Sequence, residues 1–119
     1  MAEYVDGFVI AIPKKNMEQY KKMAKTAAKV WREHGALDYR ECVAEDLKVK
    51  FGTPYHKLVG AKPSETIIFA WITFKSRAQR DKINKKVMED PRILGMCGPE
   101  NAPFEMSRMS YGGFETLVK

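Results

Sequence analysis

The side chains in this sequence that could carry out acid–base chemistry are few and scattered. The candidates are His34, Asp38, Glu41, Arg108 and Tyr111, and Trp31 and Trp71 could form apolar walls beside them. Imidazole, carboxylate and phenol groups can exchange protons, and a guanidinium can hold an anion. Catalysis requires several of these groups to converge in one concave site, expected between a sheet and its helices. Such a site would suit cofactor-independent oxygenation of an electron-rich aromatic compound, or an isomerisation.

Each candidate also has an ordinary structural explanation. His34 falls in the last turn of an expected helix, just before Gly35, where a cation favours the helix dipole. Trp31 falls on the apolar stripe of the same helix and would serve as a core anchor. Asp38 and Glu41 fall in a charged strand, which is typical of a sheet edge. The sequence therefore leaves catalysis and plain binding of a small apolar or aromatic ligand both open.

We predict neither a metal site nor a cofactor. The chain has two histidines and two cysteines, and none of them forms a close ligand pair. Both cysteines are expected to be reduced thiols, with Cys42 packed in a strand. Cys97, in the loop from Met96 to Phe104, could instead be an exposed reactive thiol.

The formal charge of +6 raises the alternative that the protein binds RNA or another polyanion. The lysines on the expected helices fall mainly on the polar face. No zinc knuckle, helix-turn-helix signature or aromatic RNA-binding motif accompanies them. This alternative therefore needs the lysines to form one continuous stripe across an assembled dimer, and specific nucleic-acid binding is not expected.

The segment Glu65–Phe74 is the most strongly determined element of the chain. Alternate residues along it are apolar on both sides, so both faces of this strand should be covered. Tyr4–Ile12 shows the same property and is ended by Pro13. These two segments are predicted to be the central strands of one sheet.

The remaining elements alternate between helices and strands. Two longer helices are expected, one capped by Asn16 and one capped by Ser76, and a short turn begins at Asp90. The other elements are a charged edge strand at 36–45, a short helix at 54–59 and a final strand at 107–118 that contains two adjacent glycines. The glycine pair indicates a bulge or a close approach of the backbone.

The order strand, helix, strand, strand, helix, strand predicts an α+β, ferredoxin-like βαββαβ fold in a single domain of residues 1–119. Both helices would cover one face of the sheet. The other face would leave a large apolar surface in water, which is rare on soluble monomers. We therefore expect a homodimer through the helix-free sheet face, forming a dimeric α/β barrel.

Composition is typical of a soluble globular protein, with 45% hydrophobic and 30% charged residues. No apolar run approaches the roughly 20 residues that span a bilayer. The acidic start of the sequence does not look like a secretory signal, so a cytoplasmic location with no membrane partner is expected.

Four motifs spread over the whole chain resemble the YbaA-like family of small bacterial proteins of unknown function. They are Tyr-Val-Asp-Gly-Phe at 4–8, Trp-Arg-Glu-His-Gly-Ala-Leu at 31–37, Glu-Thr-Ile-Ile-Phe-Ala-Trp at 65–71 and Arg-Met-Ser-Tyr-Gly-Gly-Phe at 108–114. The resemblance implies membership of the dimeric α/β-barrel group, which includes antibiotic-biosynthesis monooxygenases, haem-degrading enzymes and small stress-response proteins. A non-catalytic, stress-related binding module is therefore a further alternative. The family supplies no catalytic residues that could be transferred to this chain.

Overall fold

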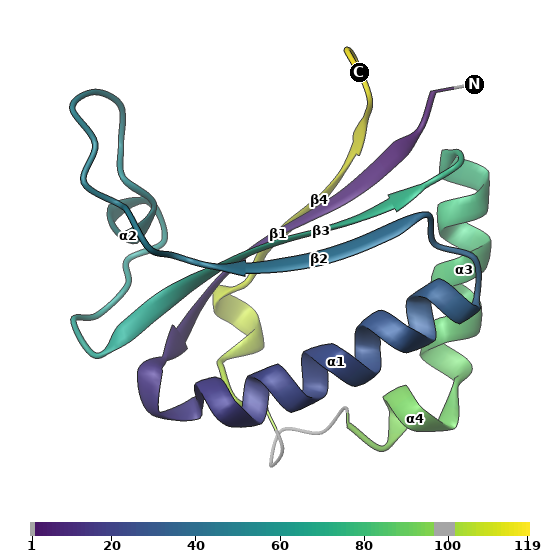
Figure 1. The fold of residues 1–119 in the computed structure, drawn as a ribbon, viewed down its shortest axis with the longest axis horizontal. Helices are drawn as coiled ribbons and strands as arrows, with labels where there is room; N and C mark the ends of the chain where they lie inside the picture. The colour runs from purple at the N-terminus through teal and green to yellow at the C-terminus, as the bar shows by residue number, and fades with distance from the viewer. Residues whose placement is uncertain (1, 97–101) are drawn as a thin grey trace.

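The protein folds around one four-stranded antiparallel sheet (Figure 1). The computed structural model describes residues 2–96 and 102–119. The strands lie in the order β2-β3-β1-β4, which is the ferredoxin-like arrangement that the sequence predicts. The elements are β1 (Tyr4–Pro13), α1 (Met17–Glu33), β2 (Asp38–Val43), α2 (Tyr55–Leu58), β3 (Glu65–Phe74), α3 (Arg77–Glu89), α4 (Pro91–Leu94) and β4 (Ser110–Glu115).

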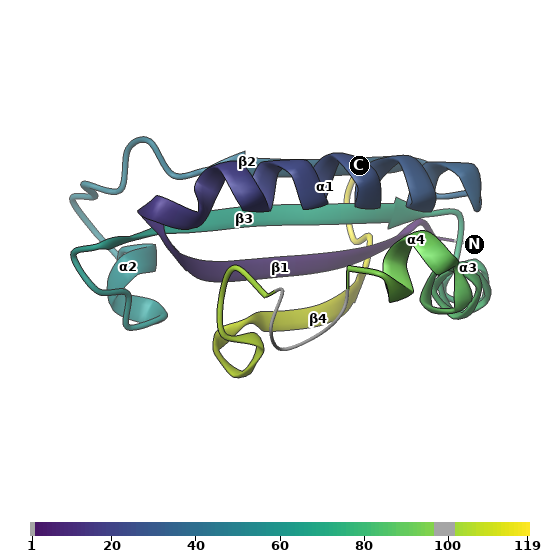
Figure 2. The ribbon, with the colours of Figure 1, turned by 90° about the horizontal axis from the view of Figure 1, so that it is seen from below.

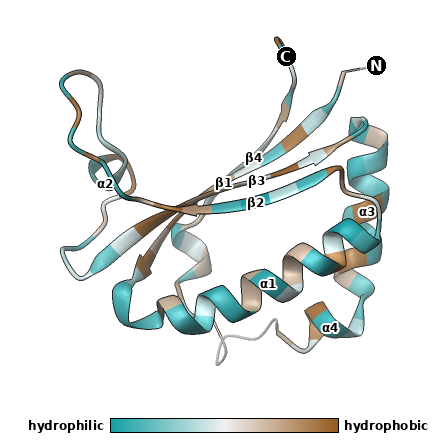
Figure 3. Cartoon of the chain, in the orientation of Figure 1, coloured by the Kyte–Doolittle hydropathy of each residue, from teal (hydrophilic) through white to brown (hydrophobic). Residues whose placement is uncertain are grey.

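The two faces of the sheet are separated by the alternation of side chains along β1 and β3. Helices α1, α3 and α4 lie on one side, and α1 runs along the strands (Figures 1 and 2). The core between them is built from strand residues such as Ile12, Ile72 and Phe74 and from helix residues such as Val30 and Val87. Hydrophobic colour follows stretches of the central strands, while much of β2 and α1 is hydrophilic (Figure 3). The prediction that β2 is a charged edge strand is confirmed.

Two helix starts carry the caps that the sequence predicts. The Ser76 hydroxyl accepts the Gln79 N–H at 3.2 Å, and the Asp90 carboxylate accepts the Arg92 N–H at 2.9 Å. Asn16 is the N-cap residue of α1, as predicted, but its side chain accepts no N–H of the helix, so the expected capping bond is absent. Its amide instead donates to the carbonyl of Pro103 at 2.8 Å. The side chain thus ties the start of α1 to a segment 87 positions away.

Strand β4 is shorter than the sequence predicts, and its glycine pair forms no bulge. Gly112 and Gly113 lie opposite Gly7 and Asp6 in an uninterrupted register. The alternative explanation, close approach, holds at Gly113, where an added Cβ would collide with the ring of Tyr4. This glycine therefore lets the edge strand lie against a central aromatic side chain.

The helix-free face is the side of the sheet away from α1. By register it carries Val5 and Phe114, which face one another, and Phe69 and Trp71, whose ring centroids lie 5.7 Å apart. Helix α2 covers one end of this face, since the Tyr55 ring centroid lies 6.0 Å from that of Phe69. The remainder is open to solvent and contains a hollow of ≈ 660 Å³.

The expectation that Cys42 is packed was wrong for this chain, because the thiol is exposed. The register places it opposite Phe69, on the uncovered side of the edge strand. Cys97 lies outside the described residues.

A buried carboxylate ties the sheet to two helices. Asp6 on β1 is only 1% exposed and points to the helix side. It accepts from Arg80 at 2.8 Å and from Asn84 at 3.1 Å, both on α3. The Asn84 amide oxygen in turn accepts the indole N–H of Trp31 on α1 at 2.9 Å. Each oxygen of the buried Asp6 carboxylate thus accepts a hydrogen bond.

Candidate functional site

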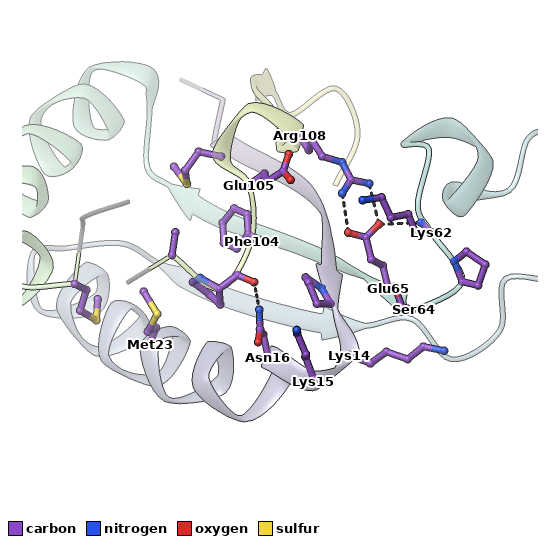
Figure 4. A pocket seen from close by; sticks show the side chains of 16 residues that line it. Lys14, Lys15, Asn16, Met23, Lys62, Ser64, Glu65, Phe104, Glu105 and Arg108 are labelled. Atoms are coloured by element: carbon purple, nitrogen blue, oxygen red, sulfur yellow. Dashed lines mark hydrogen bonds and ion pairs between the residues drawn. The ribbon is translucent and has the colours of Figure 1, made fainter. Parts of the chain in front are cut away.

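A large cleft lies at the end of the sheet where β1 stops and β3 begins (Figure 4). Its volume is ≈ 1320 Å³. Pro13 and Glu65 are paired in the sheet there, and the Lys14 N–H donates to the Ser64 carbonyl at 3.0 Å. The chain turns into α1 on one side, and the segment 102–108 passes over the other. Three segments distant in sequence thus form its walls.

The floor of this cleft is apolar. Pro103 is buried, and Phe104 packs edge-on against Tyr20 with ring centroids 5.9 Å apart. Met23 and Met106 also line the cleft. Methionines and aromatic rings suit apolar ligands of varied shape.

One wall of the cleft is an ion pair. Arg108 donates to both oxygens of Glu65, at 2.7 and 2.9 Å, and also to the Gly60 carbonyl at 3.1 Å. The Lys62 N–H donates to the same carboxylate at 2.8 Å. These hydrogen bonds, first those from Arg108, lower the pKa of Glu65 from 4.5 to about 2. The carboxylate is therefore a fixed charge near neutral pH and a poor general base.

Because the pKa of Glu65 is lowered by Arg108, the loss of stability on replacing Arg108 should depend on pH. The folded pKa of Glu65 is near 2 and its unfolded pKa is near 4.5, so the ion pair stabilises fully above about pH 4.5 and is lost as pH falls through about 2. Arg108→Gln should lower the melting temperature by several degrees at neutral pH, and this difference should shrink between about pH 4.5 and about pH 2. Circular dichroism melts over this range measure it. Lys119→Gln, which breaks an exposed pair with Glu3, is the control. A difference independent of pH would contradict the assignment.

Two lysines project at the opposite wall. Lys14 and Lys15 are exposed, and no ion pair with another described residue holds either of them. Lys15 is drawn beside Asn16 at the mouth of the cleft (Figure 4). Among the described residues, Glu65 and Glu105 are the acids that line the cleft. The cleft thus carries an excess of positive charge.

The structure places Arg108 at the cleft and the other polar candidates elsewhere. His34 ends α1 and its Nε2 lies 2.9 Å from the Asp90 carboxylate. Asp38 lies at the start of β2, 3.9 Å from Arg32. Tyr111 on β4 stacks on Phe8, with ring centroids 5.0 Å apart.

Glu41 is the centre of a separate cluster under α1. It accepts hydrogen bonds from the hydroxyls of Tyr20 and Tyr39, the latter at 2.5 Å. Burial, followed by the charge of Glu41, raises the pKa of both phenols above the usual range. Both tyrosines therefore stay protonated and act as donors.

The two tryptophans lie on opposite faces of the sheet. Trp31 is anchored to Asn84 on the helix side, and Trp71 lies on the helix-free face under the Arg40 guanidinium, 5.8 Å from its ring. Neither lines the cleft. No hydrogen bond or ion pair joins any two of His34, Asp38, Glu41, Arg108 and Tyr111, all of which the structure describes.

Most residues of the cleft follow no pattern that could be recognised in the sequence. Glu65 was assigned only as the start of a strand, and Lys15 only as one lysine among many. Glu65 and Arg108 are 43 positions apart, so no local spacing pairs them. Within residues 2–96 and 102–119, no group of three or more His, Cys, Asp or Glu side chains is placed to hold a metal ion. The helices of the same residues include none with the length and apolar character needed to cross a bilayer.

The basic residues of α1 follow its solvent side. Lys21, Lys25, Lys29 and Arg32 are exposed and recur at spacings of three and four. This row lies opposite the stripe that packs on the sheet, as expected for an amphipathic helix.

The topology and the single layer of helices define a protein of the α+β, ferredoxin-like class. A crystal structure of a dimeric ferredoxin-like protein from an uncultured marine organism shares this fold, with a TM-score of 0.65, 9% identity and coverage of 100% of this chain and 99% of that chain. A nipsnap family protein of unknown function from Agrobacterium tumefaciens is similar, with a TM-score of 0.59, 14% identity and coverage of 97% and 88%.

The chain belongs to the family described as protein of unknown function DUF1428, whose model matches residues 3–106. It is 40% identical to the uncharacterized protein YbaA of Escherichia coli K12 over 116 residues, which cover 98% of this chain and 97% of that protein. The resemblance found in the sequence motifs is confirmed.

Proposed function

We propose that residues 1–119 act as a single cytoplasmic domain that forms a homodimer and binds a small apolar or aromatic ligand in the cleft beside Glu65 and Arg108. The exposed free thiol of Cys42 fits a reducing compartment. Both clusters of buried apolar residues pack between the same sheet and its helices, which supports one domain.

The helix-free face supports the homodimer. Phe69 is 43% exposed and Phe114 is 62% exposed, and they flank the hollow over Gly7 and Gly112. Contiguous apolar surface of this kind marks an interaction site on a soluble protein. A second copy is the occupant we propose, because a face apolar along two central strands matches another such face about a two-fold axis. The marine ferredoxin-like protein of the same fold is described as dimeric.

The cleft is the observation that carries ligand binding. It is concave and its floor is made of Met, Phe and Pro side chains, which are properties of small-molecule sites. Charged side chains surround this floor, and among them Glu65 and Arg108 are held by an ion pair. Oxygenation and isomerisation are not part of the proposal. The Glu65 carboxylate is paired with Arg108, and His34 and Glu41 have partners outside the cleft.

Met106→Gln should weaken binding of a neutral apolar probe. Met106 lines the cleft and is 61% exposed, so the replacement removes apolar contact without disturbing the core. We expect about a fivefold higher Kd for N-phenyl-naphthylamine, from the loss of about 1 kcal/mol of apolar contact. Fluorescence titration of the full chain measures it.

The matched control is Met88→Gln on α3, which replaces another half-exposed methionine outside the cleft. Its Kd should equal that of the wild type. A wild-type protein that fails to bind the probe, or equal weakening by both variants, would show that the cleft is not the binding site.

A further inference from the structure

We infer that the ligand of the cleft is an amphipathic anion, with an apolar body on the Phe104 floor and a carboxylate or similar acidic group at Lys14 and Lys15. This inference rests on the proposed ligand-binding function. It adds the chemical class of the ligand and the residues that select it.

The charges around the cleft are not equivalent. Arg108 and Glu65 neutralise each other through two short hydrogen bonds, so this pair attracts neither sign of charge strongly. Lys62 also acts on Glu65, since its charge helps to lower the pKa of that carboxylate. The ammonium groups of Lys14, Lys15 and Lys62 form no ion pair with a described residue, but Lys14 and Lys15 are not among the residues that lower the pKa of Glu65.

The positions of these charges define a polarity for the bound molecule. Lys14 and Lys15 lie where β1 ends and α1 is about to begin, on the rim of the cleft. The apolar residues Pro103 and Phe104 lie deeper, held against the same turn by the hydrogen bond from Asn16. A ligand with an apolar body on this floor would bring an acidic terminus to the rim beside Lys15. The exposed side chain of Lys14 extends away from Lys15 in Figure 4 and would turn toward the same group by a change of rotamer.

With a neutral ligand bound, the ammonium groups of Lys14 and Lys15 would stay hydrogen-bonded to water and would add nothing to the binding affinity. An acidic group at the rim gains charge-assisted hydrogen bonds and stays partly hydrated, so its desolvation cost is limited. The exposed carboxylate of Glu105, on the segment 102–108, reduces this attraction for an acidic group. The charges at the rim therefore favour anionic over cationic ligands.

Two probes that differ by one acidic group test the inference. Anilinonaphthalene sulfonate carries a sulfonate that N-phenyl-naphthylamine lacks. Lys14→Gln/Lys15→Gln should raise the Kd of the sulfonate probe about tenfold and change the Kd of the neutral probe less than about twofold. The Kd of the sulfonate probe should also rise with added salt, and that dependence should be weaker in the variant.

The control is Lys82→Gln/Lys85→Gln, which removes two exposed charges from α3 away from the cleft. It should leave both affinities unchanged. Met106→Gln separates the two proposals, because it should weaken both probes if both bind in the cleft. If Met106→Gln weakens both but the two lysine variants behave alike, the anion inference is overturned and the cleft stands as an apolar site. If neither probe responds to Met106→Gln, the proposed function fails and the inference with it.

Discussion

Phe69→Asp is expected to convert the protein from a particle of twice 13.6 kDa into one of 13.6 kDa. Phe69 lies on the helix-free face between the rings of Tyr55 and Trp71 and is 43% exposed in the single chain. In a two-fold dimer the substitution would place two carboxylates in one apolar interface. Burying a charge without a partner costs several kcal/mol, so the dimer Kd should rise by about a hundredfold or more.

Sedimentation velocity at micromolar concentration measures this change. Leu94→Asp is the matched control, since Leu94 is an exposed leucine of α4, on the helix side. It should remain dimeric. A monomeric wild type, or a Phe69→Asp variant of unchanged mass, would contradict the proposed interface.

Asp6→Ala is expected to lower the free energy of unfolding by about 3 kcal/mol, because it leaves the Arg80 guanidinium without its main partner inside the protein. The side chains of Asp6 and Arg80 are 2% and 13% exposed. Asn84 also loses its acceptor, which loosens the link from Trp31 to the sheet. Urea unfolding followed by circular dichroism, at one fixed protein concentration, measures the loss.

A second acid on the same arginine provides the control. Asp81 pairs with the Arg80 Nε at 2.8 Å but is 61% exposed. Asp81→Ala should cost at most about 1 kcal/mol, as is usual for solvated pairs. In the double variant Asp6→Ala/Arg80→Met the buried guanidinium is gone as well, so the loss should be smaller than the sum of the two single losses. Equal effects of the Asp6 and Asp81 variants would show that burial of the pair is unimportant.

Local sequence patterns were sufficient to predict those strands and helices whose boundaries are determined by residues close in sequence. Strand β3 was predicted to the residue, because its apolar alternation begins and ends within the segment itself. The starts of α3 and α4 followed from Ser76 and from Asp90 with Pro91, since each cap bonds an N–H two or three residues away. The central position of β1 and β3 followed from their apolar character on both sides.

Features that depend on distant partners were not predictable. Strand β4 was predicted too long because it is paired only from Ser110 to Glu115, alongside the first part of β1. The hydrogen bond from the Asn16 side chain to Pro103 joins residues 87 positions apart, so the sequence around Asn16 does not indicate it. The cleft is formed by three segments that meet only after the sheet has assembled, so its residues had no common signal in the sequence.

The Tyr20–Glu41–Tyr39 cluster has a consequence for how accurately the edge strand is aligned. Successive residues of a strand point to opposite faces, so sliding β2 by one position along β3 would swing the Glu41 carboxylate away from α1. Two phenol hydroxyls would then be stranded beneath the helix without an acceptor. Strand β2 is short and polar, so its apolar contacts alone favour no single alignment with β3. The carboxylate of Glu41 therefore selects the register of this edge strand.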